Sequence, residues 1–195
     1  MKKKKPAVKK NTKSKILTIS QALIQTHGYQ GFTLQDLADR VGIKKPSLFD
    51  HYPNKETLTL ELIEIYYQKF TDWTLSISEL KPDKKIFAFF QIYLGFANDH
   101  EKICPLVALS FDLAKLPKKI HRKIKAFSER ILNWLQEVIL TGQKTGLFNR
   151  RLFSSAYARL GFNLAMGSQI CARINKDPDE IKSIAFTFLN LLKMR

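Results

Sequence analysis

The sequence has few cysteines, few acidic residues and no long apolar run. Cys104 and Cys171 are the two cysteines of a 195-residue chain, too few for a disulfide framework, which favours a reducing compartment. The richest apolar stretch, residues 86–97, is interrupted by Gln91 and is shorter than the roughly 18 residues that a membrane-crossing helix needs. The lysine-rich start is not followed by the apolar segment of a signal peptide. We therefore expect a protein of the cytoplasm with no membrane partner.

Signals of catalysis and of metal binding are also missing. The histidines at positions 27, 51, 100 and 121 show no metal-ligand spacing, and the sequence has neither a glycine-rich phosphate loop nor a nucleophile elbow. No segment shows sustained strand alternation, and no internal repeat is present. We expect no enzyme, no cofactor and no metal ion.

Positive charge is what the chain has in excess. It carries 33 Lys and Arg against 17 Asp and Glu, a formal net charge of +16, and residues 1–55 alone hold 12 of these basic residues against 3 acidic ones. A basic balance suits a nucleic-acid partner, but it also suits a membrane surface or a ribosomal protein. Residues 1–11 are too polar and charged to fold alone, so they predict a disordered lysine-rich tail, either a solubilising run or an arm along DNA.

The apolar residues recur at helical spacing from about Thr12 to the end of the chain, which predicts an all-α fold of about nine helices. Asp177-Pro178-Asp179-Glu180 predicts the start of the last helix, with Glu180 closing a capping box. The expected helices are about 12–28, two short ones within 33–52, 55–78, 82–100, 105–116, 118–142, 151–175 and 178–193.

Residues 33–52 have the pattern of a helix-turn-helix. Thr33 is the expected N-cap of a first short helix, with Asp36 in capping-box position. Gly42 permits the positive φ that the turn needs, and Pro46 falls in the first turn of a second short helix, around which lysines gather. Such a unit presents a recognition helix to the major groove of DNA.

A specific combination of residues covers most of the amino-terminal third: Gly28-Tyr29-x-Gly31-Phe32-Thr33, Ala38-x-x-Val41-Gly42-Ile43 and Ser47-Leu48-Phe49-x-His51-Tyr52-x-Asn54-Lys55-x-x-Leu58. With this combination the chain resembles the tetracycline-repressor (TetR) family of bacterial regulators. The resemblance implies a helical homodimer with a three-helix DNA-binding head, here residues 12–55, and a ligand-binding and dimerisation body, here residues 56–195. It implies a transcriptional regulator, a repressor that a small-molecule effector releases from a palindromic double-stranded DNA operator.

The head supplies the candidate DNA contacts. Lysines can meet phosphates or guanine edges, and a serine hydroxyl can meet a base edge. Phe49 replaces the tyrosine usual in the family, and Asp50 is a second departure, an acid that DNA repels unless a cytosine amino group or a lysine pairs with it. The candidate DNA-binding residues are Thr33, Lys44, Lys45, Pro46, Ser47, Phe49, Asp50, His51, Tyr52 and Lys55.

The body supplies candidates for dimerisation and for an apolar, aromatic or electrophilic effector. Cys104 precedes Pro105 at an expected helix N-terminus, whose partial charge favours a thiolate, so an electrophile- or oxidant-sensing role competes with that of a small capping or buried residue. The candidate effector residues are Phe90, Tyr93, Cys104, Phe111, Asp112, Trp134 and Asn163. The candidate dimer residues, small or apolar at helical spacing, are Gly161, Ala165, Ser168, Ala172, Ile181, Ile184, Ala185 and Phe188; the competing interpretation places them in the core of a single chain. For the whole protein the alternative is an architectural DNA-binding protein without an effector.

Overall fold

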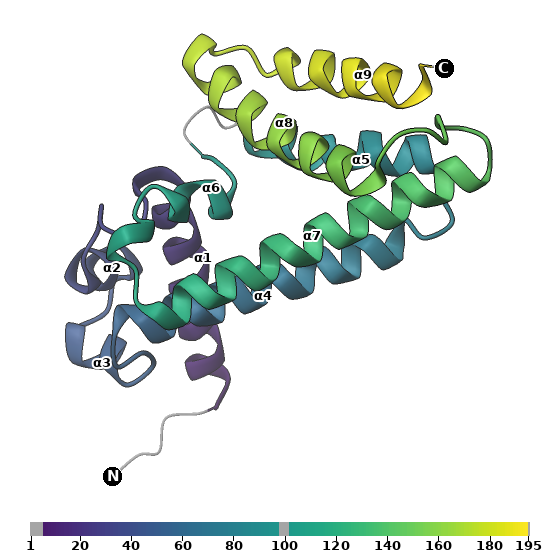
Figure 1. The fold of residues 1–195 in the computed structure, drawn as a ribbon. Coiled ribbons are helices and arrows are strands. Elements are labelled where there is room, and N and C mark those ends of the chain that lie inside the picture. The colour runs from purple at the N-terminus through teal and green to yellow at the C-terminus, as the bar shows by residue number, and fades with distance from the viewer. Residues whose placement is uncertain (1–5, 98–101, 195) are drawn as a thin grey trace. The chain divides into compact units, whose positions relative to one another are not determined.

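The computed structural model describes residues 6–97 and 102–194, with side chains from residue 11 onward (Figure 1). These residues form nine α-helices and one short 3-10 helix and contain no strand, which confirms the all-α prediction. None of the described helices is both long enough and apolar enough to cross a membrane. The helices are α1 (Pro6–His27), α2 (Leu34–Val41), α3 (Lys45–Phe49), α4 (Lys55–Ser76), α5 (Pro82–Ala97), α6 (Pro105–Ser110), the 3-10 helix η1 (Leu113–Lys115), α7 (Lys118–Lys144), α8 (Ser154–Asn175) and α9 (Asp179–Lys193).

The first helix begins earlier than its apolar period indicates. Helix α1 starts at Pro6 rather than near Thr12, so residues 6–11 of the expected disordered tail are helical, whereas residues 1–5 lie outside the described residues. Proline is tolerated at the first helical position because its missing N–H has no partner there, and once a helix is nucleated each further turn adds hydrogen bonds. The helix is anchored by its buried face, where Ile16 and Ile24 are fully buried.

The expected helix 105–116 is divided in two. Helix α6 ends at Ser110 in a turn in which the backbone N–H of Asp112 donates to the carbonyl of Leu109 at 3.3 Å, and η1 follows, where the N–H of Lys115 donates to the carbonyl of Asp112 at 2.8 Å. The side chain of Asp112 accepts a hydrogen bond from the backbone N–H of Gln30, a residue 82 positions away. A long-range contact therefore overrides a local period that would have allowed one helix.

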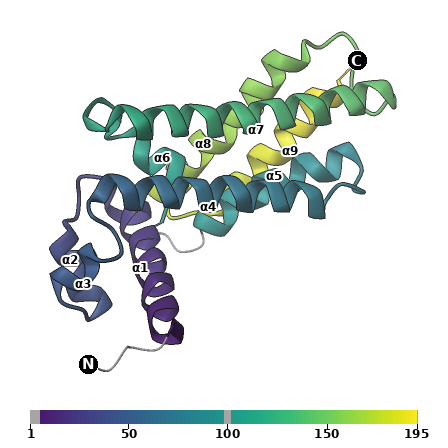
Figure 2. The same ribbon diagram turned by 90° about the horizontal axis from the view of Figure 1, so that it is seen from below.

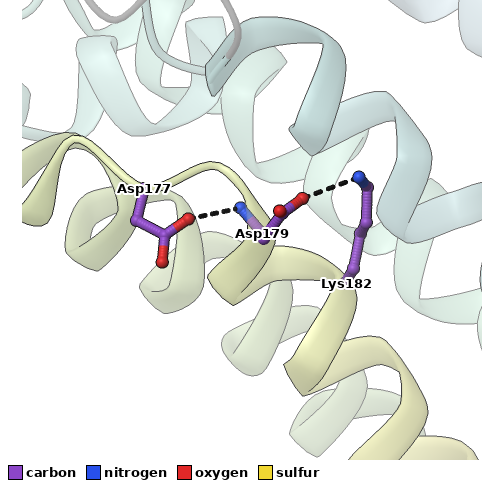
Figure 3. A network of polar contacts seen from close by, with 3 residues as sticks. All are labelled: Asp177, Asp179 and Lys182. Atoms are coloured by element: carbon purple, nitrogen blue, oxygen red, sulfur yellow. Dashed lines mark hydrogen bonds and ion pairs between the residues drawn. The ribbon is translucent and has the colours of Figure 1, made fainter.

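The last helix begins close to its expected position but without the expected capping box. Asp177 Oδ1 accepts from the N–H of Asp179 at 3.0 Å, and Asp179 Oδ1 accepts from Lys182 Nζ at 2.6 Å (Figure 3). The carboxylate of Glu180 accepts instead from the side-chain amide of Asn175, the last residue of α8. Glu180 thus bridges the α8–α9 turn and does not close a box with Asp177, because Asn175 lies within its reach.

The chain divides into two compact units. Unit 1 contains the described residues of Met1–Tyr67 together with Pro105–Ile124, and in it α1 packs against α2 and α6 while α2 packs against α3. Unit 2 contains the described residues of Gln68–Cys104 and Lys125–Arg195, and in it α5, α8 and α9 pack on one another (Figure 2). The boundary expected at residue 55 stays a prediction; unit 1 also takes in α6 and the start of α7.

Candidate nucleic-acid interface

Helix α2 begins at a complete capping box. Thr33 Oγ1 accepts from the backbone N–H of Asp36 at 3.1 Å, and Asp36 Oδ2 accepts from the backbone N–H of Thr33 at 2.7 Å and from its hydroxyl at 2.8 Å. The hydrogen bonds from the backbone and then the side chain of Thr33 hold the pKa of Asp36 below its usual value. The box predicted from the sequence is confirmed. Because the Thr33 hydroxyl is used inside it, its main role is to fix the start of the helix.

The turn after α2 is stabilised by its own backbone hydrogen bonds and by a side chain of α1. Gly42 has φ 76°, and its N–H donates to the carbonyls of Ala38 and Asp39 at 3.0 and 3.1 Å, which ends the helix. Lys15 on α1 donates from Nζ to the carbonyl of Val41 at 2.8 Å. A methyl group at residue 42 would meet nothing within 4 Å, so the glycine is needed for its backbone conformation.

Helix α3 is short and presents most of its side chains to solvent. Leu48 is fully buried and anchors it, while Pro46 occupies the first turn as expected. Phe49 is 42% exposed, and the Nζ of Lys45 lies 5.9 Å from the centre of its ring. The structure thus brings six of the candidate residues to one exposed segment: Lys44, Lys45, Pro46, Ser47, Phe49 and Asp50.

Tyr52, which follows this exposed segment, is buried. Only 2% of the residue is accessible, and its hydroxyl donates to Glu61 on α4 at 3.0 Å. Burial, and next the hydrogen bond to Glu61, raise the pKa of Tyr52. Lys13 forms an ion pair with Glu61 at 2.8 Å and lies over the tyrosine ring. Tyr52 therefore ties the segment after α3 to α1 and α4, and its proposed contact with DNA stays a prediction. Its neighbour His51 is half-buried.

Lys55 opens α4 and folds back onto the α1–α2 turn. Its Nζ donates to the carbonyl of Phe32 and lies 3.7 Å from the centre of the Phe32 ring and 4.9 Å from that of Tyr29. Burial lowers the pKa of Lys55, while the charges of Asp112 and Asp36 act in the opposite direction. In this position the ammonium group ties α4 to the turn before α2. Its proposed contact with phosphate remains a prediction.

Asn54 caps α4 as the sequence predicts. Its Oδ1 accepts from the backbone N–H of Thr57 at 2.8 Å, which satisfies one of the free N–H groups of the first turn. The start of α4 is therefore fixed by an ordinary cap and by the lysine that follows it.

Two candidate effector residues belong to unit 1 instead of unit 2. Phe111 is 69% exposed, and the carboxylate of Asp112 accepts from the N–H of Gln30 at 2.9 Å. Gly28, with φ 72°, lies beside that carboxylate: a methyl group at residue 28 would come within 3.0 Å of Asp112 Oδ2. Asp112 thus holds the turn that leads into α2. No local pattern pointed to this role because the two segments lie far apart along the chain.

The other candidate effector residues belong to unit 2 but do not all lie together. Phe90 and Tyr93 are buried in an aromatic cluster in which the ring of Phe89 lies 5.9 Å from that of Trp134 and 5.2 Å from that of Tyr93. Burial, with a smaller contribution from the charge of Cys104, raises the pKa of Tyr93. Asn163 on α8 is exposed, whereas these rings are buried.

Cys104 is held next to this cluster through its backbone. The residue is 7% exposed, and its N–H donates to Gln169 Oε1 at 2.8 Å. Gln169 is itself fully buried, and its Nε2 donates to the carbonyl of Tyr93 at 3.4 Å. Because Cys104 is buried, a reaction at its thiol would need a local opening of the structure, and its sensing role stays a prediction.

The candidate dimer residues are packed inside the single chain. An added methyl group on Gly161 would come within 2.7 Å of the ring of Phe188, so α9 lies directly against this part of α8. Seven of the eight candidate residues are buried within the single chain and Ile184 is half-buried, and their role in a dimer stays a prediction: Gly161, Ala165, Ser168, Ala172, Ile181, Ile184, Ala185 and Phe188.

A second apolar stripe on α8 remains exposed. Leu160, Ile170 and Ile174 are 38%, 37% and 74% exposed, and Asn163 and Gly167 lie between them at the same helical spacing. These exposed positions are spaced by three and four residues, as are the buried positions of α8, so the sequence contains both stripes. Only the packing of α9 shows which of the two stripes is buried. On α9, Phe186 is 57% exposed.

Three comparisons with known proteins agree with this arrangement. The family model described as bacterial regulatory proteins of the tetR family matches residues 16–62, a range that includes α2, α3 and the start of α4. The chain is 28% identical over 128 residues, 66% of its length and 67% of the relative, to the biofilm operon icaADBC HTH-type negative transcriptional regulator IcaR of Staphylococcus epidermidis.

Solved structures of similar proteins cover almost the whole chain. A TetR transcriptional regulator from Legionella pneumophila is 29% identical, with a TM-score of 0.83, over 93% of this chain and 97% of that one. A TetR-family regulator from Agrobacterium tumefaciens superposes with a TM-score of 0.89 at 22% identity, over 95% of this chain and 99% of that one, which is a likeness of fold.

Proposed function

The chain belongs to the tetR family of bacterial regulatory proteins and is a DNA-binding transcriptional regulator, and we propose that it acts as a homodimeric repressor whose operator binding ends when a small molecule binds. The observation that carries this proposal is the exposed α3 segment, fixed between a capped α2, a buried Leu48 and a buried Tyr52. The IcaR relatives, which are negative regulators by name, favour repression over activation. Because chromosomal DNA is the target, the protein would act in the cytoplasm.

The exposed side chains of α3 divide into two kinds of contact. Lys44 and Lys45, at the start of the helix, would meet phosphates or the acceptor edge of guanine. Ser47 would meet a base edge, and the ring of Phe49 would lie against a sugar or a thymine methyl group. Asp50 would accept from a cytosine amino group or pair with a lysine. Since Tyr52 and Lys55 are held inside unit 1, they position the helix in this scheme.

Two copies of the chain are needed for useful specificity. A recognition helix of five residues reaches only a few base pairs, so a palindromic site read by two heads supplies the remaining contacts. We assign the dimer surface to the exposed stripe of α8, with Leu160, Ile170 and Ile174, and to the exposed face of α9 around Phe186. Burying these apolar side chains would favour association.

Effector release would use the aromatic body of unit 2. An aromatic or apolar molecule that enters the cluster around Phe90, Tyr93 and Trp134 must displace packed rings, so its binding would favour a second arrangement of the helices. An electrophile would instead react at Cys104, once a local opening exposes the thiol. Either event would change the spacing of the two heads and so weaken their match to the operator.

In-vitro selection from random duplexes tests the proposal. The full chain should enrich a palindrome and bind it with two chains per duplex, and Lys45→Ala should weaken that binding. Lys69→Ala, an exposed lysine of unit 2, is the matched control that removes the same charge elsewhere. Recovery of sequences without symmetry, or equal weakening in the two variants, would contradict the proposal.

A further inference from the structure

A second basic surface lies in unit 1, outside the helix-turn-helix. Residues 113–124, which include η1 and the start of α7, contain five Lys and Arg and no Asp or Glu. We name this surface the α7 basic segment and define it by Lys115, Lys118, Lys119 and Arg122, all exposed.

The segment is anchored on one side, so its charged side chains extend from the other. Leu116, Ile120 and Ile124 are buried on the opposite side, with 8%, 0% and 9% exposure. Long cationic side chains on a helix anchored in this way form a surface, whereas a charge run in a loop would not. The N-terminus of the 27-residue α7 adds partial positive charge at the same place.

The charges of the segment are poorly compensated. Lys123, which follows it, forms an ion pair with Glu64 on α4 at 2.6 Å, but the four residues of the segment form no ion pair with any other residue that the structure describes. Lys118 and Arg122 are a like-charge pair four residues apart on one helix, which destabilises the free protein. A polyanion would relieve this repulsion.

The segment lies beside the start of α4. Asp112, just before it, interacts electrostatically with Lys55 at the first residue of α4, and Lys123 pairs with Glu64 further along the same helix. Within unit 1 the two helices therefore run in the same direction and begin at the same end, as both views show (Figures 1 and 2). That end of α4 follows the recognition helix α3 by a connection of only five residues, 50–54.

We propose that the α7 basic segment binds the phosphodiester backbone of the same DNA that α3 reads, at positions beyond the bases that α3 contacts. It would supply affinity without sequence preference, since lysine and arginine on phosphate carry no base information. This inference rests on the proposed operator binding. DNA is favoured over an anionic lipid surface because the segment shares a compact unit with the helix-turn-helix.

The test compares two triple variants with equal loss of charge. Lys118→Gln/Lys119→Gln/Arg122→Gln removes three of the four charges of the segment, and Lys69→Gln/Lys81→Gln/Lys84→Gln removes three exposed lysines of unit 2. Binding of the selected operator is measured against salt concentration, and the bound complex is mapped by hydroxyl-radical footprinting for the backbone and by methylation protection for the bases. Far-ultraviolet circular dichroism and thermal unfolding confirm that both variants are folded.

The segment variant should lose backbone protections while it keeps the base protections. The slope of its plot of log K against log salt should become shallower by about 0.9 for each phosphate that the variant no longer neutralises. The control variant should keep all protections. A full backbone footprint in the segment variant, or an equal reduction in both variants, overturns the inference while operator binding stands. Loss of binding to phosphatidylglycerol vesicles with an unchanged footprint also overturns it, in favour of a lipid surface. A wild-type chain that selects no DNA overturns both the inference and the proposed function.

Discussion

Replacing Gly161 with alanine tests the packing of α8 against α9. The added methyl carbon would lie 2.7 and 2.8 Å from two carbons of the Phe188 ring, whereas carbon atoms in contact prefer about 3.5–4.0 Å. Phe188 is fully buried, and its ring centre lies 5.9 Å from that of Phe90. The backbone or the ring must shift, and both are held by the packing of α5, α8 and α9.

The magnitude follows from two opposing effects. Overpacking a filled core costs about 1–3 kcal/mol, while alanine in a helix interior is favoured over glycine by about 1 kcal/mol. We expect Gly161→Ala to lower the free energy of unfolding by roughly 0–2 kcal/mol. Gly95→Ala is the matched control, because Gly95 is exposed on α5 and nothing lies within 4 Å of its added methyl group. The free energy of unfolding of this variant should rise by about 1 kcal/mol.

Urea unfolding at one fixed protein concentration measures the difference between these two variants. The concentration is fixed because dimer formation changes apparent stability. We expect the alanine at residue 161 to be the less stable variant by about 1–3 kcal/mol. If it were as stable as the alanine at residue 95, Phe188 would not lie against Gly161. Loss of dimer in gel filtration without loss of chain stability would instead support the dimer face expected from the sequence.

Three single interactions provide further tests. Because Thr33 lowers the folded-state pKa of Asp36 below its unfolded value, the carboxylate stabilises the fold above the unfolded pKa and loses that effect as the pH falls through the lowered value. Asp36→Asn should therefore lose less stability on acidification than the wild type, as measured by urea unfolding from neutral pH to about pH 3. Identical stability profiles of the two proteins would refute this. Asp112→Ala should destabilise the chain by about 1 kcal/mol and speed hydrogen exchange at the amide it accepts from, and an unchanged exchange rate would count against its role in the turn. Cys104→Ser should abolish operator release by quinones or aldehydes while Cys171→Ser, at an exposed cysteine, retains it; equal responses would exclude Cys104 as the sensor.

The start of the helix-turn-helix could be predicted because its signals are local. A cap and its partner are three residues apart, as in Thr33 with Asp36 and Asn54 with Thr57, so the sequence shows both members together. Gly42 likewise marks its own turn through its positive φ. These interactions depend on a few neighbouring residues and hardly at all on the rest of the fold.

Long-range partners could not be read from periodicity. Helix α8 carries two stripes of small or apolar residues, and spacing alone provides no reason to bury the one with Gly161 and expose the one with Ile170. The side chains of Asp112 and Lys55 meet the α1–α2 turn from distant parts of the sequence, so each looks available for another role in the sequence alone. The hydrogen bond from Tyr52 to Glu61 could not be foreseen from the local motif because Glu61 is on the next helix, and the DNA contact of Tyr52 stays a prediction.

Competition binding tests the central claim most directly. A labelled duplex that carries the selected palindrome is bound by the full chain at about 150 mM salt, then challenged with the same duplex or with one whose half-sites are scrambled. Sequence-specific regulators prefer their sites by roughly a thousandfold or more, and we predict a preference of that order that Lys45→Ala reduces. Equal competition by the two duplexes would contradict the account and identify an architectural DNA-binding protein.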